Sequence, residues 1–420
     1  MSIEQVLVIS RSGKLVYSSG KSNNDNDLSQ SAVLLALIAV VESFDNDALS
    51  EIHSTKSIVV LEFCDPLILA AWIPSCESSI YVTRRILRSL FDQIVTTLTL
   101  SYMRDLFVRK NNCDFRAILS GTERMLDALC SLGSENRYDK LAISIMMNAV
   151  HCMSIPHSIR FKVNGLLQSH FNLKGVIFAL LLHGDDLISS CRLSPYILHT
   201  SDINLLINFI KSSNSLKSIE AWLPFCLPKF DTSGFVHAYV CYINNEQCSL
   251  IVLTTETEGF SEISSKRCAF EKKFKSLKLN DALSKYLSIQ SFPLCTMPTQ
   301  LRTSGIIHFL YKSKDHAQYV LPRKKIGQFI RQEYFYMLRN INLIDCYVDL
   351  QSNMGRSKSE SIIIWKEEVC LVAKNSKSFQ LFASFDPSLT EKQIRRSLDL
   401  LLTYFRAMQS TWFITDRCKF

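Results

Sequence analysis

The sequence predicts an α+β protein made of three similar units in tandem, each an antiparallel five-stranded sheet with flanking helices. The order strand, strand, helix, strands, helix recurs three times along the chain. The length of 420 residues fits three domains, at a prior of roughly 150 residues each. The 47% hydrophobic content, with only 12 Gly and 10 Pro, indicates a chain that is folded almost from end to end. We place the units at residues 1–150, 155–297 and 300–420.

The first unit opens with a hairpin, because two apolar segments flank the turn sequence Arg11-Ser12-Gly13. The apolar run that follows has helical spacing, and Ser29 or Ser31 can cap it. Asp65-Pro66 separates two further strands. The predicted elements are strands at residues 6–10 and 14–18, a helix over 31–44, strands at 58–63 and 67–73, a helical stretch over 79–107, and a helical connector over 113–132 that is weakened at Gly121.

The second unit contains residues 220–256, where the alternation of strands and turns is the clearest in the chain. Pro228 ends a short apolar strand because proline has no amide donor. Asn244-Asn245-Glu246 makes a hairpin turn between two alternating segments. The predicted elements are a hairpin over 174–193 that turns at Gly184-Asp185-Asp186, a helix over 201–211 capped by Ser201, strands at 221–226, 235–243 and 248–255 with a turn over 229–234, and helical sequence over 262–287.

The third unit repeats this order. Its last helix begins at Thr390, and an apolar stripe on that helix must face a sheet. A serine- and lysine-rich segment, residues 352–361, is expected to be a loop. The predicted elements are strands at 306–312 and 318–321, a helix over 325–339, strands at 362–365, 369–373 and 379–385, and the final helix with Ile394, Leu398, Leu401, Leu402 and Phe405 as its stripe.

The cysteine pattern and hydropathy indicate a cytosolic protein. Fourteen cysteines are scattered along the chain and no secretory leader precedes them, so we expect reduced thiols. The longest apolar run, residues 31–41, is far shorter than the roughly 20 residues that cross a bilayer. We therefore expect no membrane span.

The net charge of +8 is concentrated in the C-terminal third. Residues 1–150 carry 14 Lys and Arg against 17 Asp and Glu, residues 151–300 carry 14 against 11, and residues 301–420 carry 19 against 11. Arg323, Lys324 and Lys325 form one basic cluster, and Arg395 and Arg396 form another. Both clusters are candidates for an anionic membrane surface, and the alternative is a solvated basic face. Nucleic-acid binding is disfavoured because exposed aromatic residues are not interleaved with the basic ones.

Candidate chemistry is sparse. His183-Gly184-Asp185-Asp186 resembles an active-site motif, because paired carboxylates can hold Mg²⁺. The same residues are favoured in a two-strand turn for backbone reasons, and we prefer this interpretation. The sequence contains no glycine-rich phosphate loop, no G-x-S-x-G, no H-E-x-x-H and no C-x-x-C. The nine histidines lack metal-ligand spacing, so no metal site is predicted.

Trp222 has two possible roles. An aromatic residue on a strand points away from its neighbours Ala221 and Leu223. It is therefore either part of the core or an exposed anchor for a protein partner.

Four segments resemble the SAND family, the Mon-one vacuolar fusion proteins. They are VLVISRSGKLVYSS near the start, DFRAILSGTERMLDAL from Asp114, AWLPFCLPKFDTSGFVHAYVCYI from Ala221 and IIHFLYKSK from Ile306. They occur in the family's order and together span most of the chain. The strand order of each unit also resembles the longin domain, a platform fold of membrane-traffic proteins. The resemblance implies three longin domains in tandem. Family members commonly carry a long polar N-terminal tail, whereas this sequence begins close to its first strand.

The resemblance also implies a function without covalent chemistry, cofactor or metal. Family members form half of a guanine-nucleotide exchange factor, pair with the triple-longin Ccz-one protein and release GDP from the late-endosomal GTPase Rab-seven. This activity converts early to late endosomes and supports vacuole or lysosome fusion. The implied location is the cytosol, with peripheral recruitment to late endosome, vacuole or lysosome membranes by a Rab-five-type GTPase and by anionic or phosphoinositide lipids. Trp222 matches the tryptophan implicated in Rab-five contact.

An exchange factor needs no catalytic triad, because binding the nucleotide-free GTPase more tightly than the GDP form accelerates release. The run SAVLLALIAVV of the first helix is wider than one buried stripe requires, so we nominate Leu34, Leu35, Ile38 and Val41 for the GTPase or partner contact. Two alternatives stay open. One is a longin scaffold or effector that binds small GTPases or traffic machinery without exchange activity, and the other is a Mg²⁺-dependent nucleotide or phosphoryl enzyme at Asp185-Asp186.

Overall fold

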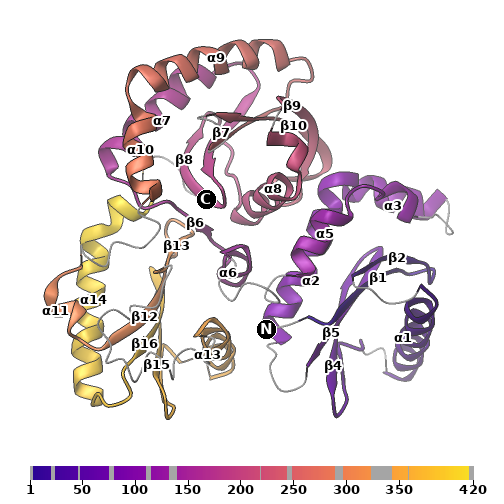
Figure 1. Ribbon diagram of the computed structural model, residues 1–420. Coiled ribbons are helices and arrows are strands. Elements are labelled where there is room, and N and C mark those ends of the chain that lie inside the picture. The colour runs from indigo at the N-terminus through magenta and orange to yellow at the C-terminus, as the bar shows by residue number, and fades with distance from the viewer. Residues whose placement is uncertain are drawn as a thin grey trace. The chain divides into compact units, whose positions relative to one another are not determined.

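The computed structural model describes residues 3–19, 24–45, 48–74, 80–109, 115–131, 140–217, 219–243, 248–288, 297–322, 343–357 and 359–415. It contains two five-stranded sheets and one six-stranded sheet with helices on their faces, which confirms the α+β class (Figure 1). The chain divides into two compact units, each described by itself. One unit holds Met1–Met146, Ser201–Asn214 and Pro224–Val236, and the other holds Met147–Thr200, Ser215–Leu223 and His237–Phe420.

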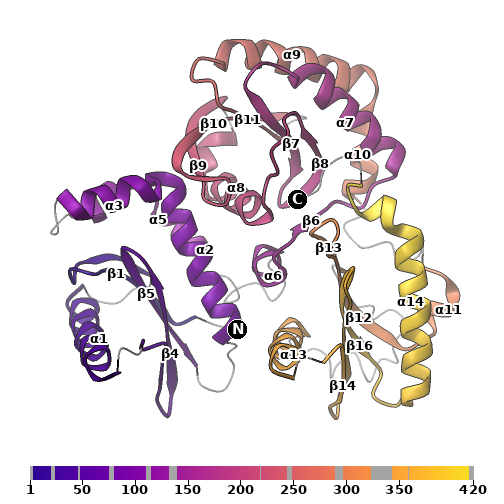
Figure 2. The same cartoon turned by 180° about the vertical axis from the view of Figure 1, so that it is seen from behind.

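The first sheet has the strand order β2-β1-β5-β4-β3, and its neighbouring strands are antiparallel. Helix α1 (Asn24–Asp45) lies on one face of this sheet and α2 (Ile80–Leu98) on the other (Figures 1 and 2). The remaining elements here are β1 (Gln5–Ser10), β2 (Leu15–Ser19), β3 (Glu51–His53), β4 (Ser57–Cys64), β5 (Leu67–Pro74), α3 (Leu100–Arg109), α4 (Phe115–Ile118), α5 (Glu123–Cys130) and α6 (Lys140–Met147).

The structure corrects three details of the first unit. The strand β3 was not predicted, because three residues are too few to show an alternating pattern. Helix α1 begins at Asn24, and the hydroxyls of Ser29 and Ser31 donate to carbonyls within it, so the predicted caps are wrong. The long helical stretch is two helices, because Thr99 adopts a left-handed φ of 58° between them. The connector breaks near Gly121, at φ 91°, as predicted.

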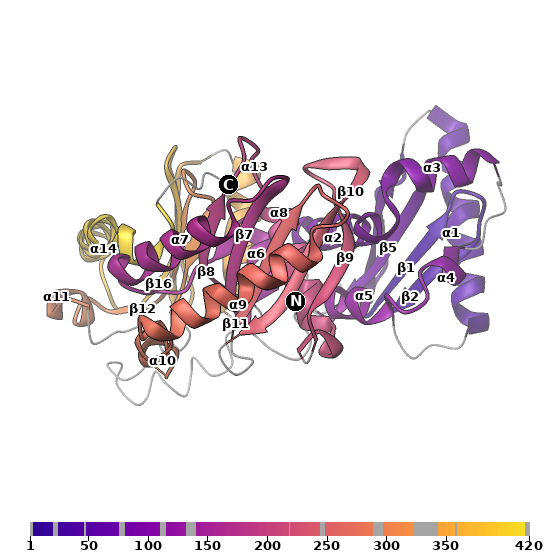
Figure 3. The ribbon, with the colours of Figure 1, turned by 90° about the horizontal axis from the view of Figure 1, so that it is seen from above.

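The second sheet has the equivalent order β8-β7-β11-β10-β9. Figure 3 shows α7 and α9 side by side over it, and their apolar residues pack with β7 and β11 in one core. The elements are α7 (His157–Phe171), β7 (Val176–His183), β8 (Asp186–Arg192), α8 (Thr200–Ser212), the 3₁₀ helix Asn214–Lys217, β9 (Ala221–Leu227), β10 (Asp231–Ile243), β11 (Cys248–Thr254), α9 (Phe260–Ser276) and α10 (Leu279–Ser288).

Pro228 ends β9 as predicted, and Pro224 is tolerated within β9 because this strand is the edge of the sheet. The predicted turn over 229–234 is wrong in length, since β10 already starts at Asp231. The helical sequence over 262–287 is interrupted at Lys278, which has a φ of 51°. Helix α7 was not predicted.

The third sheet has the order β14-β15-β16-β12-β13, extended at β13 by the parallel strand β6 (Val150–His151). Helix α14 (Glu391–Trp412) covers one face, and its predicted stripe joins the core with Phe309 and Phe385. The side chain of Gln393 accepts hydrogen bonds from the backbone and hydroxyl of Thr390, so the helix begins where the sequence predicts. The remaining elements are α11 (Thr299–Arg302), β12 (Ile306–Ser313), β13 (Gln318–Val320), α13 (Leu343–Ser357), β14 (Ser361–Trp365), β15 (Cys370–Asn375) and β16 (Phe379–Phe385).

Two predictions in the third unit need comment. The segment 352–361 is not a loop throughout, because α13 continues to Ser357. The helix is anchored by the fully buried apolar residues Leu343, Tyr347 and Leu350. The helix predicted over 325–339 lies outside the described residues.

Candidate functional site

The outer face of α1 carries several large exposed apolar side chains. Between Asp27 and Glu42 the helix has no charged residue. Its large exposed apolar side chains are Leu28, Val33, Leu37, Val40 and Phe44, and their exposed fractions range from 41% to 78%. A row of exposed apolar side chains is typical of a protein interaction surface. We call these five residues the α1 outer face.

The residues nominated from the sequence lie mostly on the opposite side of α1. Leu34 and Ile38 are buried in the core with Leu7 and Leu61 of the sheet. Leu35 packs partly against this core, and Val41 is half-buried. The nomination of the helix for a partner contact stays a prediction, but its exposed residues are those of the α1 outer face. The uninterrupted apolar run indicated a helix with apolar residues on more than one side. The sequence alone did not show which of these residues face the sheet and which are exposed.

Helix α1 also has the length and apolar composition of a membrane span over Asp25–Phe44, which the sequence analysis did not predict. The span is longer than the run 31–41 because the helix extends at both ends of it. Leu34 and Ile38 pack into the core of the first sheet, so we describe α1 as a core helix with an exposed outer face.

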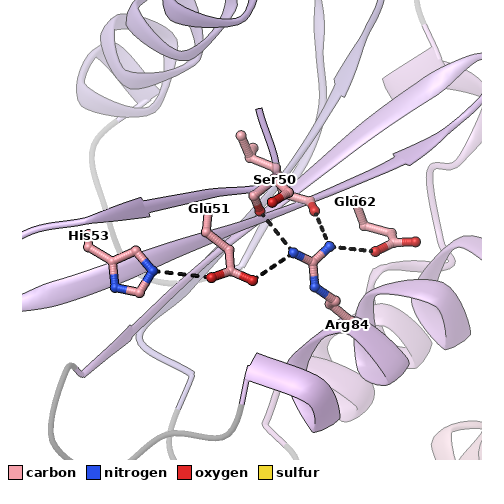
Figure 4. A network of polar contacts seen from close by, with 6 residues as sticks. Ser50, Glu51, His53, Glu62 and Arg84 are labelled. Atoms are coloured by element: carbon pink, nitrogen blue, oxygen red, sulfur yellow. Dashed lines mark hydrogen bonds and ion pairs between the residues drawn. The ribbon is translucent and has the colours of Figure 1, made fainter. Parts of the chain in front are cut away.

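A polar network on the same domain fixes the edge strand β3 (Figure 4). Nη2 of Arg84, on α2, lies 2.8 Å from Oε1 of Glu51 on β3. Nη1 of Arg84 also donates to the backbone carbonyl oxygen of Leu61 and lies 3.4 Å from the carboxylate oxygen Oε2 of Glu62, both on β4. Nε of Arg88 lies 2.6 Å from Oε1 of Glu62. The hydrogen bond from Arg84 holds the pKa of Glu51 below its ordinary value, and the network ties a three-residue strand to a long helix.

A half-buried aromatic cluster surrounds Trp222 at the start of β9. Its indole stacks on the ring of His237, with centroids 5.4 Å apart and an interplanar angle of 16°. The ring of Phe260 meets it edge-on at 6.2 Å. Trp222 is neither fully buried nor fully exposed, so both interpretations from the sequence remain in part.

A buried carboxyl lies in the first compact unit. Asp202, at the start of α8, is fully buried and accepts a hydrogen bond from the backbone amide of Lys229 at 3.2 Å, while its Oδ2 has no partner among the described residues. Nζ of Lys229 lies 3.1 Å from Asp92 on α2. Burial raises the pKa of Asp202 to about 7.

The segment His183-Gly184-Asp185-Asp186 is the turn between β7 and β8, and Gly184 has a φ of 55°. Asp186 is buried and its Oδ1 lies 2.7 Å from Nδ1 of His151. Among the described residues, no group of three or more His, Cys, Asp or Glu side chains is arranged to hold a metal. This geometry favours the turn over the Mg²⁺ site.

The predicted basic surface is described only in part. Arg323, Lys324 and Lys325 lie outside the described residues. Arg395 is exposed and paired with Glu391 one turn earlier on α14, and Arg396 is exposed. Helix α9 also carries exposed lysines that the charge gradient did not single out, among them Lys266, Lys272 and Lys273.

Most thiols in the described part of the chain are buried, and Cys268 is exposed. The ten cysteines in this part are free, and nine of them are at least partly buried. Burial raises the pKa of Cys64, Cys130, Cys226 and Cys241 to about 12 each, so these thiols stay protonated near neutral pH.

Comparison with known families matches all three domains. Residues 4–129 match the first longin domain of FUZ, MON1 and HPS1, residues 174–272 match the second, and residues 305–407 match the third. The matched ranges fall inside the three predicted units, whose boundaries stay a prediction.

Curated relatives are similar over almost the whole chain. Vacuolar fusion protein MON1 homolog A of Gallus gallus is 29% identical over 415 residues, 98% of this chain and 72% of the relative. Protein SAND of Takifugu rubripes is 29% identical over 98% of this chain and 76% of the relative. Vacuolar fusion protein MON1 of Yarrowia lipolytica is 25% identical over 99% of this chain and 75% of the relative.

Proposed function

Because this chain belongs to the family defined by the three longin domains of FUZ, MON1 and HPS1, we propose that it acts in vacuolar fusion as one half of a guanine-nucleotide exchange factor. The chain is similar to MON1 and SAND proteins over 98% of its own length. Its other half is a Ccz-one-type triple-longin subunit. Its substrate is a Rab-seven-type GTPase of late endosomes, vacuoles or lysosomes. The names of the relatives support the role in vacuolar fusion, and the exchange activity and partners are our proposal.

The α1 outer face is the observation that carries this proposal. A surface of Leu28, Val33, Leu37, Val40 and Phe44 without intervening charge can bury apolar area against a partner subunit or a GTPase. The inner residues Leu34 and Ile38 hold the helix on its sheet at the same time. The helix is therefore rigid enough to present a defined surface.

Exchange by this surface requires no catalytic side chain. A surface that binds the nucleotide-free GTPase more tightly than the GDP-bound form speeds GDP release in proportion to the difference in binding free energy. This fits a chain in which the one motif that resembles an active site, His183 to Asp186, forms a turn.

Recruitment completes the proposal. A Rab-five-type GTPase binds at Trp222 and an anionic or phosphoinositide membrane binds the basic C-terminal third, so that a cytosolic complex collects on endosomal, vacuolar or lysosomal membranes.

The test is release of a fluorescent GDP analogue from the Rab-seven-type GTPase by this chain purified with its Ccz-one-type partner. Acceleration that disappears when the partner is omitted supports the heterodimeric exchange factor. Stable complex formation without acceleration instead supports the longin scaffold, which binds GTPases and leaves exchange to another protein.

A further inference from the structure

The surface around Trp222 includes a second exposed aromatic residue. Phe260, the first residue of α9, is 38% exposed and meets the edge of the Trp222 indole. An ideal Cβ built on the preceding Gly259 would lie only 3.4 Å from Cη2 of Trp222. The two rings therefore form one patch, with the other face of the indole against His237.

Helix α9 also holds the strand that carries Trp222. Glu220 directly precedes β9, and its Oε2 accepts hydrogen bonds from Tyr239 at 2.8 Å and from Ser264 at 2.7 Å. Its Oε1 pairs with Arg267, whose Nη1 bonds Glu271 at 3.1 Å. Phe260, Ser264 and Arg267 are spaced four and three residues apart, so one face of α9 both borders the indole and clamps the start of the edge strand.

The aromatic patch has an acidic border. Glu256 and Glu258 lie in the connection between β11 and α9 that leads to Phe260, and both are exposed. A partner that covers the patch therefore needs an apolar centre with lysine or arginine residues around it. Charge complementarity with such a surface selects a protein partner and opposes an anionic membrane at this place.

We propose that Trp222 and Phe260 form one contact surface for the recruiting Rab-type GTPase, with Arg267 as the positioning residue that holds Trp222 in place through Glu220. The inference rests on the proposed function, because it takes Trp222 as the recruitment contact. It adds a second anchor, a positioning residue and the charge of the partner surface.

The experiment measures binding of the GTP-loaded Rab-five-type GTPase to the full chain purified with its Ccz-one-type partner. Phe260→Ala is expected to weaken binding about tenfold, as for an aromatic residue at the centre of an interface. The matched control is Phe161→Ala on α7. Phe161 is another exposed phenylalanine, 61% exposed, and lies on a different helix from Phe260, so this change is expected to leave binding unchanged. Raising the salt concentration is expected to weaken binding to the unmodified chain, because the acidic border then contributes less.

A positioning role for Arg267 is separated from a general structural role by a double-mutant cycle. Arg267→Met is expected to weaken binding in the chain with Trp222 and to have little further effect beside Trp222→Ala. Arg267→Met should also change the emission of Trp222, taken as the difference between chains with and without that tryptophan, and Arg267→Lys should restore part of both signals. Equal losses in the two backgrounds with unchanged emission overturn the positioning role.

The outcomes distinguish the inference from the function beneath it. If Trp222→Ala leaves GTPase binding intact, recruitment at Trp222 is wrong and the inference falls with it. If Trp222→Ala weakens binding and Phe260→Ala does not, the recruitment contact stands and the two-residue surface is wrong.

Discussion

Nη1 of Arg160 donates a hydrogen bond to the carbonyl oxygen of Phe413 at 3.0 Å, across 253 residues of sequence. Arg160, on α7, is 2% exposed and also bonds the carbonyls of Ser410 and Thr411 at the end of α14. Its other donors reach Ile188 and Met153. A cation at the carboxyl end of a helix interacts favourably with the helix dipole. Through these hydrogen bonds a single side chain joins α7 to the end of α14 within one compact unit.

Arg160→Met is therefore expected to destabilise this unit by about 3 kcal/mol or more, because several buried carbonyls lose their donor. Arg160→Lys should recover only part of the loss, since an ammonium cannot reach five carbonyls. Denaturant unfolding measures the effect. Arg395→Met, at an exposed position, is the control and should stay within about 0.5 kcal/mol of the unmodified chain.

Substitutions on α1 should separate stability from function. Leu37→Lys with Val40→Lys on the α1 outer face is expected to leave unfolding nearly unchanged and to abolish accelerated GDP release or partner binding, because a desolvated lysine opposes an apolar interface. Ile38→Ala on the inner side should instead cost about 2–4 kcal/mol of stability.

Val108→Lys on α3 is the control for the α1 pair, because Val108 is 84% exposed and belongs to another helix. If the variant with Leu37→Lys and Val40→Lys still forms the complex and accelerates GDP release normally, the α1 outer face is not the contact surface.

Asp202 should make the first compact unit more stable at acidic pH than at neutral pH. Its pKa is raised by burial from an ordinary 3.8 to about 7, so the folded chain holds a proton between these values that the unfolded chain releases. The contribution of Asp202 to the free energy of unfolding therefore falls by at most about 4 kcal/mol as pH rises from about 4 to about 7. Above that pH it is level. Asp202→Asn should remove this fall. The free energy of unfolding is measured with urea from pH 5 to pH 8, and a pH dependence that is the same in the variant and the unmodified chain contradicts the assignment.

The two aspartates of the β7–β8 turn should behave differently from each other. Asp185→Ala is expected to leave both stability and exchange unchanged, because Asp185 is a half-buried turn residue. Asp186→Ala should cost about 3 kcal/mol or more, because it leaves His151 buried without this partner. Complexes that remain folded should exchange normally, and loss of exchange by Asp185→Ala at normal stability would instead support the Mg²⁺-dependent enzyme.

The sequence predicted more of the fold than of the site. The three sheets were predictable because strands such as β7 and β11 are long, apolar and bounded by turns, and because Thr390 and Gln393 mark a helix start. The three residues of β3 gave no pattern, and the left-handed Thr99 and Lys278 look like ordinary helix residues in the sequence. At the site, the aromatic environment of Trp222 and the pairing of Arg267 with Glu220 join separate segments of the chain, so no local pattern could predict them.

Charge reversal should test whether the C-terminal third faces a membrane. Arg395→Glu with Arg396→Glu is expected to lower binding to vesicles that contain anionic lipid, since each basic residue contributes about 1 kcal/mol near such a surface. The same change at Arg323, Lys324 and Lys325 should lower it further. Arg395 pairs with Glu391 one turn earlier on α14, so part of its charge is neutralised within the helix.

The matched control is Lys272→Glu with Lys273→Glu on α9, which changes the net charge of the chain by the same amount at exposed positions. If membrane binding depends on a surface of the third domain, the α14 pair weakens it more than the α9 pair, and raising the salt concentration reduces the difference. If both pairs weaken binding equally, the membrane responds to total charge. If neither does and salt has no effect, the basic clusters are solvated faces, and recruitment depends on the GTPase contact at Trp222 alone.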